Sequence, residues 1–439
     1  MEKIEAADSL KRVFGLPTLV IYGVGDILGA GIYAVVGKIA GLSGALVWAS
    51  FLVAMSVAAL TALSYAELGS RLPFSGGVAV FVHRAFRTEW LSVIVGWLMF
   101  CTCIVSMATI SKAFAGYLFK SAPIFPAIFP EWLVILALFC GLAFINFRGM
   151  QESSSLNIFC TTLEVSGLLL VIVVSTLFIS GGASTAVTAP AISGDVGWIA
   201  IFQGAALAFY AFIGFEDIVN VAEEVKNPER NVPRAVLLSL GIAGVIYVLV
   251  SWLATQVLNP AALSASGAPL LEVVQRAQPN FPGVIFTVIA LFAVLNTALL
   301  NFITASRLLF GMSRDGLLPA WFSKLHATRA TPYRTIVVIL PIVISLALSG
   351  TLQFLAGTTA TLILAMFCLV NLSLLVIKRR EGTADGFQVP AIIPVLAFLS
   401  NLVLIAFASQ ESHLLATAFV GVGFILVLVR KAFMKGSAT

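Results

Sequence analysis

The sequence predicts an all-α integral membrane protein, and three observations support this fold class. Apolar residues make up 60% of the 439 residues and charged residues only 10%, whereas charged residues form about 25% of soluble domains. The mean hydropathy is +1.06, so the chain has too little polar surface to cover a soluble globule. The apolar residues occur in runs of about 20, the length that a helix needs to cross a bilayer. These properties exclude a soluble enzyme, a nucleic-acid-binding protein and a disulfide-rich secreted domain.

About twelve apolar runs form a single polytopic membrane domain over residues 1–439. The first run begins after Pro17 and is too long for a cleavable signal sequence, so it is expected to stay in the membrane. The ninth is short. The spans are predicted at residues 17–41, 43–68, 90–119, 127–146, 154–180, 198–222, 233–257, 281–309, 335–349, 351–377, 389–408 and 411–430.

The placement of the basic residues predicts the orientation of these spans. With the N-terminus in the cytoplasm, 21 of the 25 Lys and Arg residues fall in cytoplasmic segments, Lys112 lies within a span, and only Lys38, Lys120 and Arg276 fall outside. This asymmetry follows the positive-inside rule and supports an even number of crossings. We therefore expect a protein of the cytoplasmic (inner) membrane with both termini in the cytoplasm, and no nucleic-acid partner is needed to explain the net charge.

Motifs for catalysis or cofactor binding are absent from the sequence. The five cysteines lie in apolar runs without a C-x-x-C pair, so we interpret them as small core residues. The patterns H-E-x-x-H, G-x-S-x-G and G-x-x-x-x-G-K-[ST] do not occur. We expect no enzyme activity, no metal and no cofactor, and a chain built of membrane helices points instead to the movement of a solute.

The first span, YGVGDILGAGIYAVVGKIAG, is rich in glycine. Each glycine costs about 1 kcal/mol in a helix interior relative to alanine. Gly25 and Gly29 have the G-x-x-x-G spacing that allows close helix packing, which is one explanation. A dinucleotide-binding loop is disfavoured because no strand precedes the glycines. We favour local unwinding at Gly29, Ala30 and Gly31, which would expose main-chain amides and carbonyls to a small zwitterion.

A second interruption is predicted in the sixth span, at Ile213, Gly214 and Phe215. Glu216 and Asp217 follow directly. Ionisable residues inside a span cost about 2.5–3.5 kcal/mol on insertion scales and indicate a functional site. The alternative is that both carboxylates cap the N-terminus of the second half-helix, where the helix dipole favours negative charge.

Spans one and six occupy equivalent positions in two predicted units of five spans each. The units cover residues 17–180 and 198–377, and residues 389–430 form two further helices. Because each unit has an odd number of spans, the two units have opposite topology. An inverted repeat of this 5+5 kind, with interrupted helices at corresponding positions, is typical of secondary transporters that bind their substrate near the membrane midplane.

Four segments of the chain resemble motifs of the amino acid–polyamine–organocation superfamily of transporters. They are GDILGAGIYAVVGKIAG in span one, SYAELGSRLPFSGGVAVFVHRAFR after span two, FYAFIGFEDIVNVAEEVKNPERNVPRAV in and beyond span six, and SRLLFGMSRDGLLP after span eight. The resemblance covers spans one to ten, and the last two helices match only in number. It implies a twelve-helix, leucine-transporter-type fold that moves amino acids or related amines by alternating access and requires no oligomer.

The resemblance also implies a substrate site made of main-chain groups at the two breaks. Amides would bind the substrate carboxylate, carbonyls would bind its amino group, and an aromatic side chain would close over it. The amides are those around Ala30, Gly31 and Ile32, the carbonyls those near Ile27, Phe212 and Ile213, the break glycines Gly29 and Gly214, and the aromatic side chain Tyr210. Ordinary packing is the alternative for Tyr210. The polar residues Asn296, Thr297 and Asn301 of span eight would either face the site or form interhelical hydrogen bonds.

Two acidic residues depart from the pattern of the superfamily. Asp26 lies one turn before the first break, where related sequences carry a small or neutral polar residue, and it can pair with a substrate ammonium or take up a proton. Glu164 in span five lies where proton-coupled relatives often place a lysine. Burial in a low dielectric favours a protonated carboxyl group, so we hypothesise that Glu164 is the coupling proton site. The alternative is a structural carboxyl group bonded to a neighbouring helix.

The sequence thus predicts a secondary active transporter of amino acids, coupled to protons by symport. Thr297 and Glu216 are further candidates for the coupling site, and sodium is the alternative coupling ion. An exchanger of amino acids or polyamines is the alternative mechanism, and a channel or a non-transporting nutrient sensor represents a different class. Elsewhere, Glu67 and Arg71 are expected to form an ion pair at a helix end because they lie at i and i+4. The resemblance of the segment that contains them to the superfamily motif implies a cytoplasmic gate as the alternative.

Overall fold

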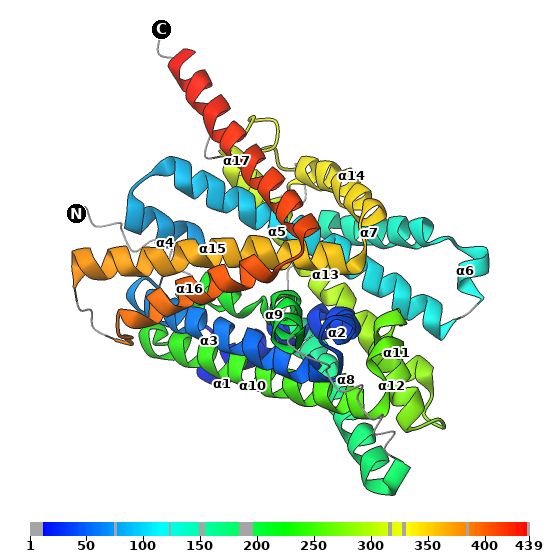
Figure 1. The fold of residues 1–439 in the computed structure, drawn as a ribbon. Helices are drawn as coiled ribbons and strands as arrows, with labels where there is room; N and C mark the ends of the chain where they lie inside the picture. Colours follow the sequence, from blue (N-terminus) through cyan, green and yellow to red (C-terminus); the bar gives the residue numbers. More distant parts are fainter. Residues whose placement is uncertain are drawn as a thin grey trace.

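A computed structural model shows a bundle of helices (Figure 1). In the part of the chain that it describes there is no strand, and only an isolated bridge joins Phe14 to Val225. The all-α prediction is therefore confirmed for these residues. The structure describes residues 12–73, 77–122, 124–148, 154–183, 196–314, 318–326, 331–382 and 386–436.

Each predicted span coincides with a helix or with a set of consecutive helical segments. Spans one and six are divided, as predicted, whereas each of the others corresponds to one main helix. Span one consists of α1 (Leu16–Leu28) and α2 (Ala30–Ser43), and span six of α9 (Val196–Ala208) with the 3₁₀ segments η3 (Phe209–Phe212) and η4 (Phe215–Glu224). Spans two to five are α3 (Val47–Arg71), α5 (Glu89–Ser121), α7 (Glu131–Arg148) and α8 (Ser154–Phe178), which continues into the π-turn η2 (Ile179–Ala183). Spans seven to twelve are α10 (Pro228–Val257), α13 (Gly283–Arg314), α14 (Tyr333–Ser349), α15 (Leu352–Glu381), α16 (Ile392–Phe407) and α17 (Gln410–Gly436).

The number of membrane crossings remains a prediction. By length and apolarity, nine helical stretches within the described residues are able to cross a membrane, and one of these, Leu16–Arg71, combines α1, α2 and α3. Helices α14 and α16 are apolar but have only 17 and 16 residues, which is below the length of about 20 residues that spans the hydrocarbon layer. The two five-span units likewise stay predictions.

Within the described residues, four further helices lie wholly or partly outside the predicted spans. They lie at opposite ends of the bundle, with α4 at one end and α6, α11 and α12 at the other (Figure 1). A search for runs of about 20 apolar residues misses them because they are short. In α12, moreover, only one face of the helix is apolar, and it is formed by Leu270, Leu271, Val273 and Val274. The four are α4 (Gly77–Phe86), α6 (Phe125–Ile128), α11 (Pro260–Ala265) and α12 (Pro269–Ala277).

The long helices pack in two groups. Helix α3 packs along α10, and α1 packs against α10 as well, whereas α5 packs against α13, α15 and α14. Helix α2 contacts α9 and η3 and also reaches α13 and α5. The two divided spans therefore lie at the boundary between the groups, where a relative movement of the groups would change their surroundings.

Several segments with predicted cytoplasmic basic residues meet at one end of the bundle. The residues before α1 contact the end of span six, where Val13 N donates to Glu224 O over 2.8 Å. At the end of α3, Ser70 Oγ donates to Glu229 O over 2.9 Å. Arg84 of α4 pairs with Glu381 of α15 over 2.9 Å. The segments before α1, after α3, after η4 and at the end of α15 thus share one side, as the predicted orientation requires.

Thr61 forms a buried polar contact among three helices. Its Oγ1 accepts hydrogen bonds from Asn371 Nδ2 of α15 over 3.2 Å and from Asn401 Nδ2 of α16 over 3.1 Å, and all three residues are fully buried.

We predict that Thr61→Val lowers the free energy of unfolding by about 1–3 kcal/mol, because buried amide donors lose an acceptor. Thr61→Ser keeps the hydroxyl and is the control. Thermal unfolding of the purified protein in detergent measures the difference, and equal midpoints for Thr61→Val and the wild type would contradict it.

Candidate functional site

The first span is interrupted at a single residue. Helix α1 ends at Leu28, Gly29 has φ −53° and ψ −143°, and α2 begins at Ala30. The break is therefore narrower than predicted, because Ala30 and Gly31 already belong to α2. A Cβ at Gly29 would lie 2.3 Å from Thr297 Oγ1 on α13, so the close approach of α13 requires glycine here.

Side chains from other helices take the main-chain groups that the first break releases. Ala30 N donates to Thr297 Oγ1 over 3.0 Å instead of to a carbonyl of its own helix. On the other side of the break, Tyr247 OH of α10 donates to the carbonyl of Ile27. These contacts satisfy polar main-chain groups that would otherwise be costly in a membrane interior. They also connect α1 and α2 to both packing groups.

The second interruption lies at Ile213 and Gly214, one residue shorter than predicted because Phe215 begins η4. Ile213 is extended, with ψ 137°, and Gly214 has φ 128°, a conformation that favours glycine. Glu216 Oε2 accepts a hydrogen bond from Gly214 N over 2.9 Å. Glu216 thus caps the segment after the break, which is the alternative that the sequence analysis left open. The segment itself is a 3₁₀ helix rather than the expected α-helix.

The two breaks are in direct contact with each other. A Cβ on Gly214 would lie 2.9 Å from the carbonyl carbon and oxygen of Asp26, and a Cβ on Gly31 would lie 2.6 Å from Cα of Ala211. No larger residue fits at Gly31 or Gly214 without displacing main chain. Residues 180 or more positions apart in the chain are thus brought together at one place.

A cavity of about 80 Å³ lies between the breaks. It is bordered by α1, α2, α5, the span-six segments, α13 and α15. Nine of the predicted site residues line it: Asp26, Ile27, Ala30, Gly31, Tyr210, Ile213, Gly214, Glu216 and Thr297. Asn301 and Asp217, which the sequence analysis also mentioned, line it as well.

The other predicted substrate residues lie behind the cavity wall. Phe212 is fully buried and packs on Phe51 and Tyr247, with ring centroids 6.3 and 5.3 Å apart. Ile32 is fully buried in the apolar core. Gly29 faces Thr297, as described above. Asn296 points toward α8 rather than into the cavity, because its Nδ2 donates to Glu164 Oε1 over 3.3 Å.

Helix α5 contributes cavity residues that the sequence analysis missed. Ser106 Oγ lies 3.2 Å from Tyr210 OH and accepts from Asn301 Nδ2 over 3.5 Å. Thr102 and Cys103 also line the cavity. The signal was the i, i+4 spacing of Thr102 and Ser106, which places two hydroxyl groups on one face of an apolar helix.

All charged residues that line the cavity are acidic: Asp26, Glu216 and Asp217. Asp217 Oδ1 accepts a hydrogen bond from Asn220 Nδ2 over 2.8 Å. No Lys or Arg belongs to the cavity lining in the part of the chain that the structure describes. The acidic lining therefore favours protons and molecules with an ammonium group over anions that have no cationic group.

Glu164 lies on α8, behind the first break. It has no exposed surface, and its main-chain carbonyl accepts from Tyr33 OH over 2.9 Å. Its partner Asn296 precedes Thr297, the residue that bonds with Ala30. Oε2 of Glu164 is buried without a hydrogen-bond partner among the described residues. The carboxyl group is thus bonded to a neighbouring helix and also keeps one oxygen able to carry a proton.

Comparisons with known proteins identify the family. The sequence model of the amino acid permease family matches residues 14–429. The branched-chain amino acid permease BcaP of Bacillus subtilis is 28% identical over 90% of this chain and 88% of its own. An uncharacterized transporter of Mycobacterium tuberculosis is 30% identical over 98% of this chain and 93% of its own. The cationic amino acid transporter 4 of Mus musculus is 29% identical over 87% of this chain and 62% of its own.

The match covers all four segments on which the predicted superfamily resemblance rests, and the family agrees with a helical, multi-pass membrane protein that transports amino acids. Two helices broken at glycines that contact each other, with a polar cavity between them, form a site suited to a small solute. The chain belongs to the amino acid permease family.

Proposed function

We propose that this protein carries amino acids across the cytoplasmic membrane by alternating access, in symport with protons. The observation that carries the proposal is the contact between the two helix breaks around a small cavity with main-chain and carboxylate groups. The substrate would be a small molecule with both a carboxylate and an ammonium group, because amides and carbonyls are both available at the breaks. The partners of the protein are then the substrate, the coupling ion and the lipid bilayer.

Substrate binding would exchange internal hydrogen bonds for bonds to the substrate. The Ala30 amide now donates to Thr297 Oγ1, so an incoming carboxylate would replace this hydroxyl group and also reach the amide near Gly31. The ammonium group would bind near the carbonyls of Ile27 and Ile213 and beside Asp26. Tyr210, whose hydroxyl lies 3.2 Å from Ser106 Oγ, is placed to cover the bound molecule.

Alternating access would follow from movement of one packing group against the other. Helices α1 and α3 both pack against α10, and in the opposing group α13 and α15 both pack against α5. The divided spans lie at the boundary and supply the site. A rocking movement would therefore expose the cavity first at one end of the bundle and then at the other.

Glu164 is the proposed site of the coupling proton. Proton uptake by Glu164 would change its hydrogen bond with Asn296. The next residue, Thr297, accepts the hydrogen bond from the Ala30 amide. Protonation and substrate binding would thus act on the same segment of α13. Glu216 and Thr297 are the other residues placed to sense the coupling ion, because both line the cavity.

An exchanger is the second candidate function, and the acidic cavity favours it. Three carboxylates, with no Lys or Arg among the lining residues that the structure describes, would suit a substrate with two ammonium groups, such as a cationic amino acid or a polyamine. Exchange of such substrates needs no proton at Glu164. Uptake into proteoliposomes discriminates between the two functions, with labelled amino acids and diamines tested under separate pH, sodium and counter-substrate gradients. Uptake of no compound under any gradient would contradict both functions and leave a non-transporting sensor.

The first prediction from the proposed function concerns Glu164. We expect Glu164→Gln to reduce uptake driven by a pH gradient at least tenfold, because glutamine cannot bind and release a proton. Counterflow exchange, which requires no net proton movement, should be retained. Glu411→Gln, at an exposed position outside the site, is the control. Unchanged gradient-driven uptake by Glu164→Gln would remove the proposed coupling role.

A second prediction concerns the contact between the breaks. Gly214→Ala places a methyl group 2.9 Å from the carbonyl of Asp26 at a residue with positive φ. We expect at least a tenfold loss of affinity for the best substrate of the uptake panel, measured by radioligand binding in detergent. The control is Gly241→Ala in α10, where nothing lies within 4 Å of the added methyl group. Equal affinities of the two variants would contradict the prediction.

A further inference from the structure

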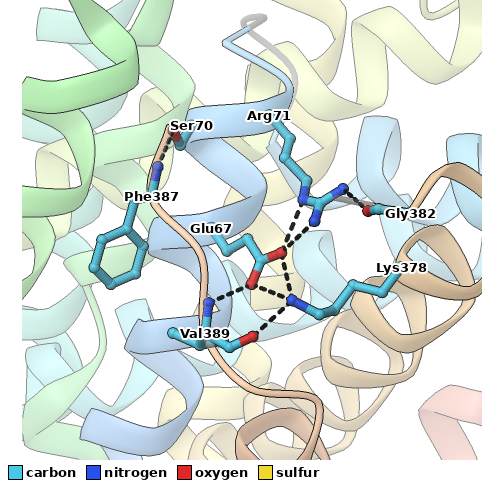
Figure 2. Close-up of polar contacts among 7 residues, drawn as sticks. All are labelled: Glu67, Ser70, Arg71, Lys378, Gly382, Phe387 and Val389. Atoms are coloured by element: carbon cyan, nitrogen blue, oxygen red, sulfur yellow. Dashed lines mark hydrogen bonds and ion pairs between the residues drawn. The ribbon is translucent and has the colours of Figure 1, made fainter. Parts of the chain in front are cut away.

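A buried ion cluster joins the end of α3 to the end of α15 and to the linker that follows α15 (Figure 2). Its centre is Glu67, which has no exposed surface. Glu67 Oε1 accepts from Arg71 Nε over 2.8 Å and from Lys378 Nζ over 2.7 Å, and Oε2 accepts from the main-chain amide of Val389 over 2.8 Å. The expected pair with Arg71 is therefore confirmed, but it is only one part of a larger cluster.

Residues 386–389, in the described part of the linker between α15 and α16, are tied to both α3 and α15. Phe387 N donates to Ser70 Oγ over 3.1 Å, and Lys378 Nζ donates to Val389 O over 2.6 Å. Gly386, at φ 112°, approaches Ser70 so closely that a Cβ would lie 2.5 Å from its hydroxyl oxygen. The linker thus crosses the end of α3 and is held there by main-chain contacts (Figure 2).

The charges of the cluster depend on one another. One buried carboxylate pairs with two cations, so the cluster of these three side chains carries one net positive charge, and Lys378 has only 16% of its side chain exposed. Removing either partner from a buried ion pair leaves the other charge without compensation. The contact between Glu67 and Lys378 is therefore stable when complete, and it separates favourably only if water reaches both groups.

Aromatic side chains near the transport cavity also join α3 to α15. Tyr65 of α3 packs against Phe215 and Phe367, with ring centroids 5.6 and 5.4 Å apart. Phe215 follows the second break directly, and Phe367 lies one helical turn after Ile363, which lines the cavity. Lys378 is a further 11 residues along α15, or about 16 Å. An aromatic contact near the cavity and an ionic contact at the helix ends thus both join α3 to α15.

We propose that Glu67 and Lys378 form an ionic gate that closes the transport cavity toward this end of the bundle. Helix α3 packs mainly on α10, and α15 packs mainly on α5 and α16, so the α3–α15 contact lies between the two groups that would move. Opening the gate separates Glu67 from Lys378 and releases the linker near Val389. The inference rests on the transport function proposed above, but it concerns access to the cavity and not flux.

The chain supplies its own reporter of access, since Cys103 lines the cavity. Replacing the other cysteines (Cys101→Ala, Cys140→Ser, Cys160→Ala and Cys368→Ala) leaves this thiol as the single target of a charged, membrane-impermeant methanethiosulfonate. Labelling is measured in vesicles of both orientations. His83→Cys, at an exposed position of α4, identifies in a parallel sample which orientation presents the gate end.

We expect Glu67→Gln and Lys378→Met each to increase the labelling rate of Cys103 from the gate end at least tenfold. Lys378→Arg keeps the charge, and its labelling rate should stay within threefold of that of the parent, the protein with Cys103 as its single cysteine. Glu381→Gln removes an exposed partner of Arg84 at the same end and should leave the rate unchanged. The variant with both Glu67→Gln and Lys378→Met should label no faster than the faster single variant, because both substitutions break one contact.

Two results would overturn the gate. One is an equal labelling rate in the parent and in both single variants, and the other is an increase from the opposite end only. Lys378→Met keeps the test decisive if Glu67→Gln does not fold, as judged by gel filtration. Labelling of Cys103 measures access to the cavity and needs no transport, whereas the uptake panel measures transport and needs no engineered cysteine. Failure of the gate and failure of the transport function are therefore separate results.

Discussion

The structure depends on one constraint, which is that main-chain polar groups inside a membrane must find partners within the protein. An unbroken helix meets this constraint alone. Here two helices are broken, and side chains supply the missing partners: Thr297 for Ala30, Tyr247 for Ile27 and Glu216 for Gly214. Two of these partners come from other helices, so the positions of α13 and α10 relative to α1 and α2 follow from the first break.

These side-chain partners also explain how the cavity can be stable by itself and still able to bind a ligand. A hydroxyl or carboxylate side chain that bonds with a freed amide can be displaced by a ligand group of similar chemistry, with one hydrogen bond exchanged for another. A main-chain carbonyl in a regular helix offers no such exchange. Under the proposed function, the internal bonds at the breaks therefore imitate the bonds made to the substrate.

Contacts within the two packing groups differ in kind from contacts between α3 and α15. Within the first group, α3 and α10 pack over long apolar faces, as Gly244 against Met55 illustrates. Between α3 and α15 the contacts include a polar one at Thr61, an aromatic one at Tyr65 and an ionic one at Glu67. Apolar faces lose their stabilisation when they separate, whereas ionic groups at the end of a bundle regain water. Under the proposed function, this contrast suits the boundary at which the two groups would move.

The sequence by itself determined the fold class, the positions of the helices and the locations of both breaks. These features are local, because composition, the length of an apolar run and the conformational freedom of Gly29 and Gly214 are all properties of short segments. It missed the short helix α4 for the same reason, since ten residues do not make a long apolar run. The amino acid permease family was also recognisable, because its motifs are continuous stretches of sequence.

Only the tertiary structure decided which residues meet. It placed Asn296 against Glu164 instead of in the cavity, and it brought Ser106 beside Tyr210. Glu67 and Lys378 are 311 residues apart in the chain, and nothing in either segment marks the other as its partner. Such contacts arise because helix rotation and packing choose the face that each side chain occupies, and these choices depend on all neighbouring helices at once.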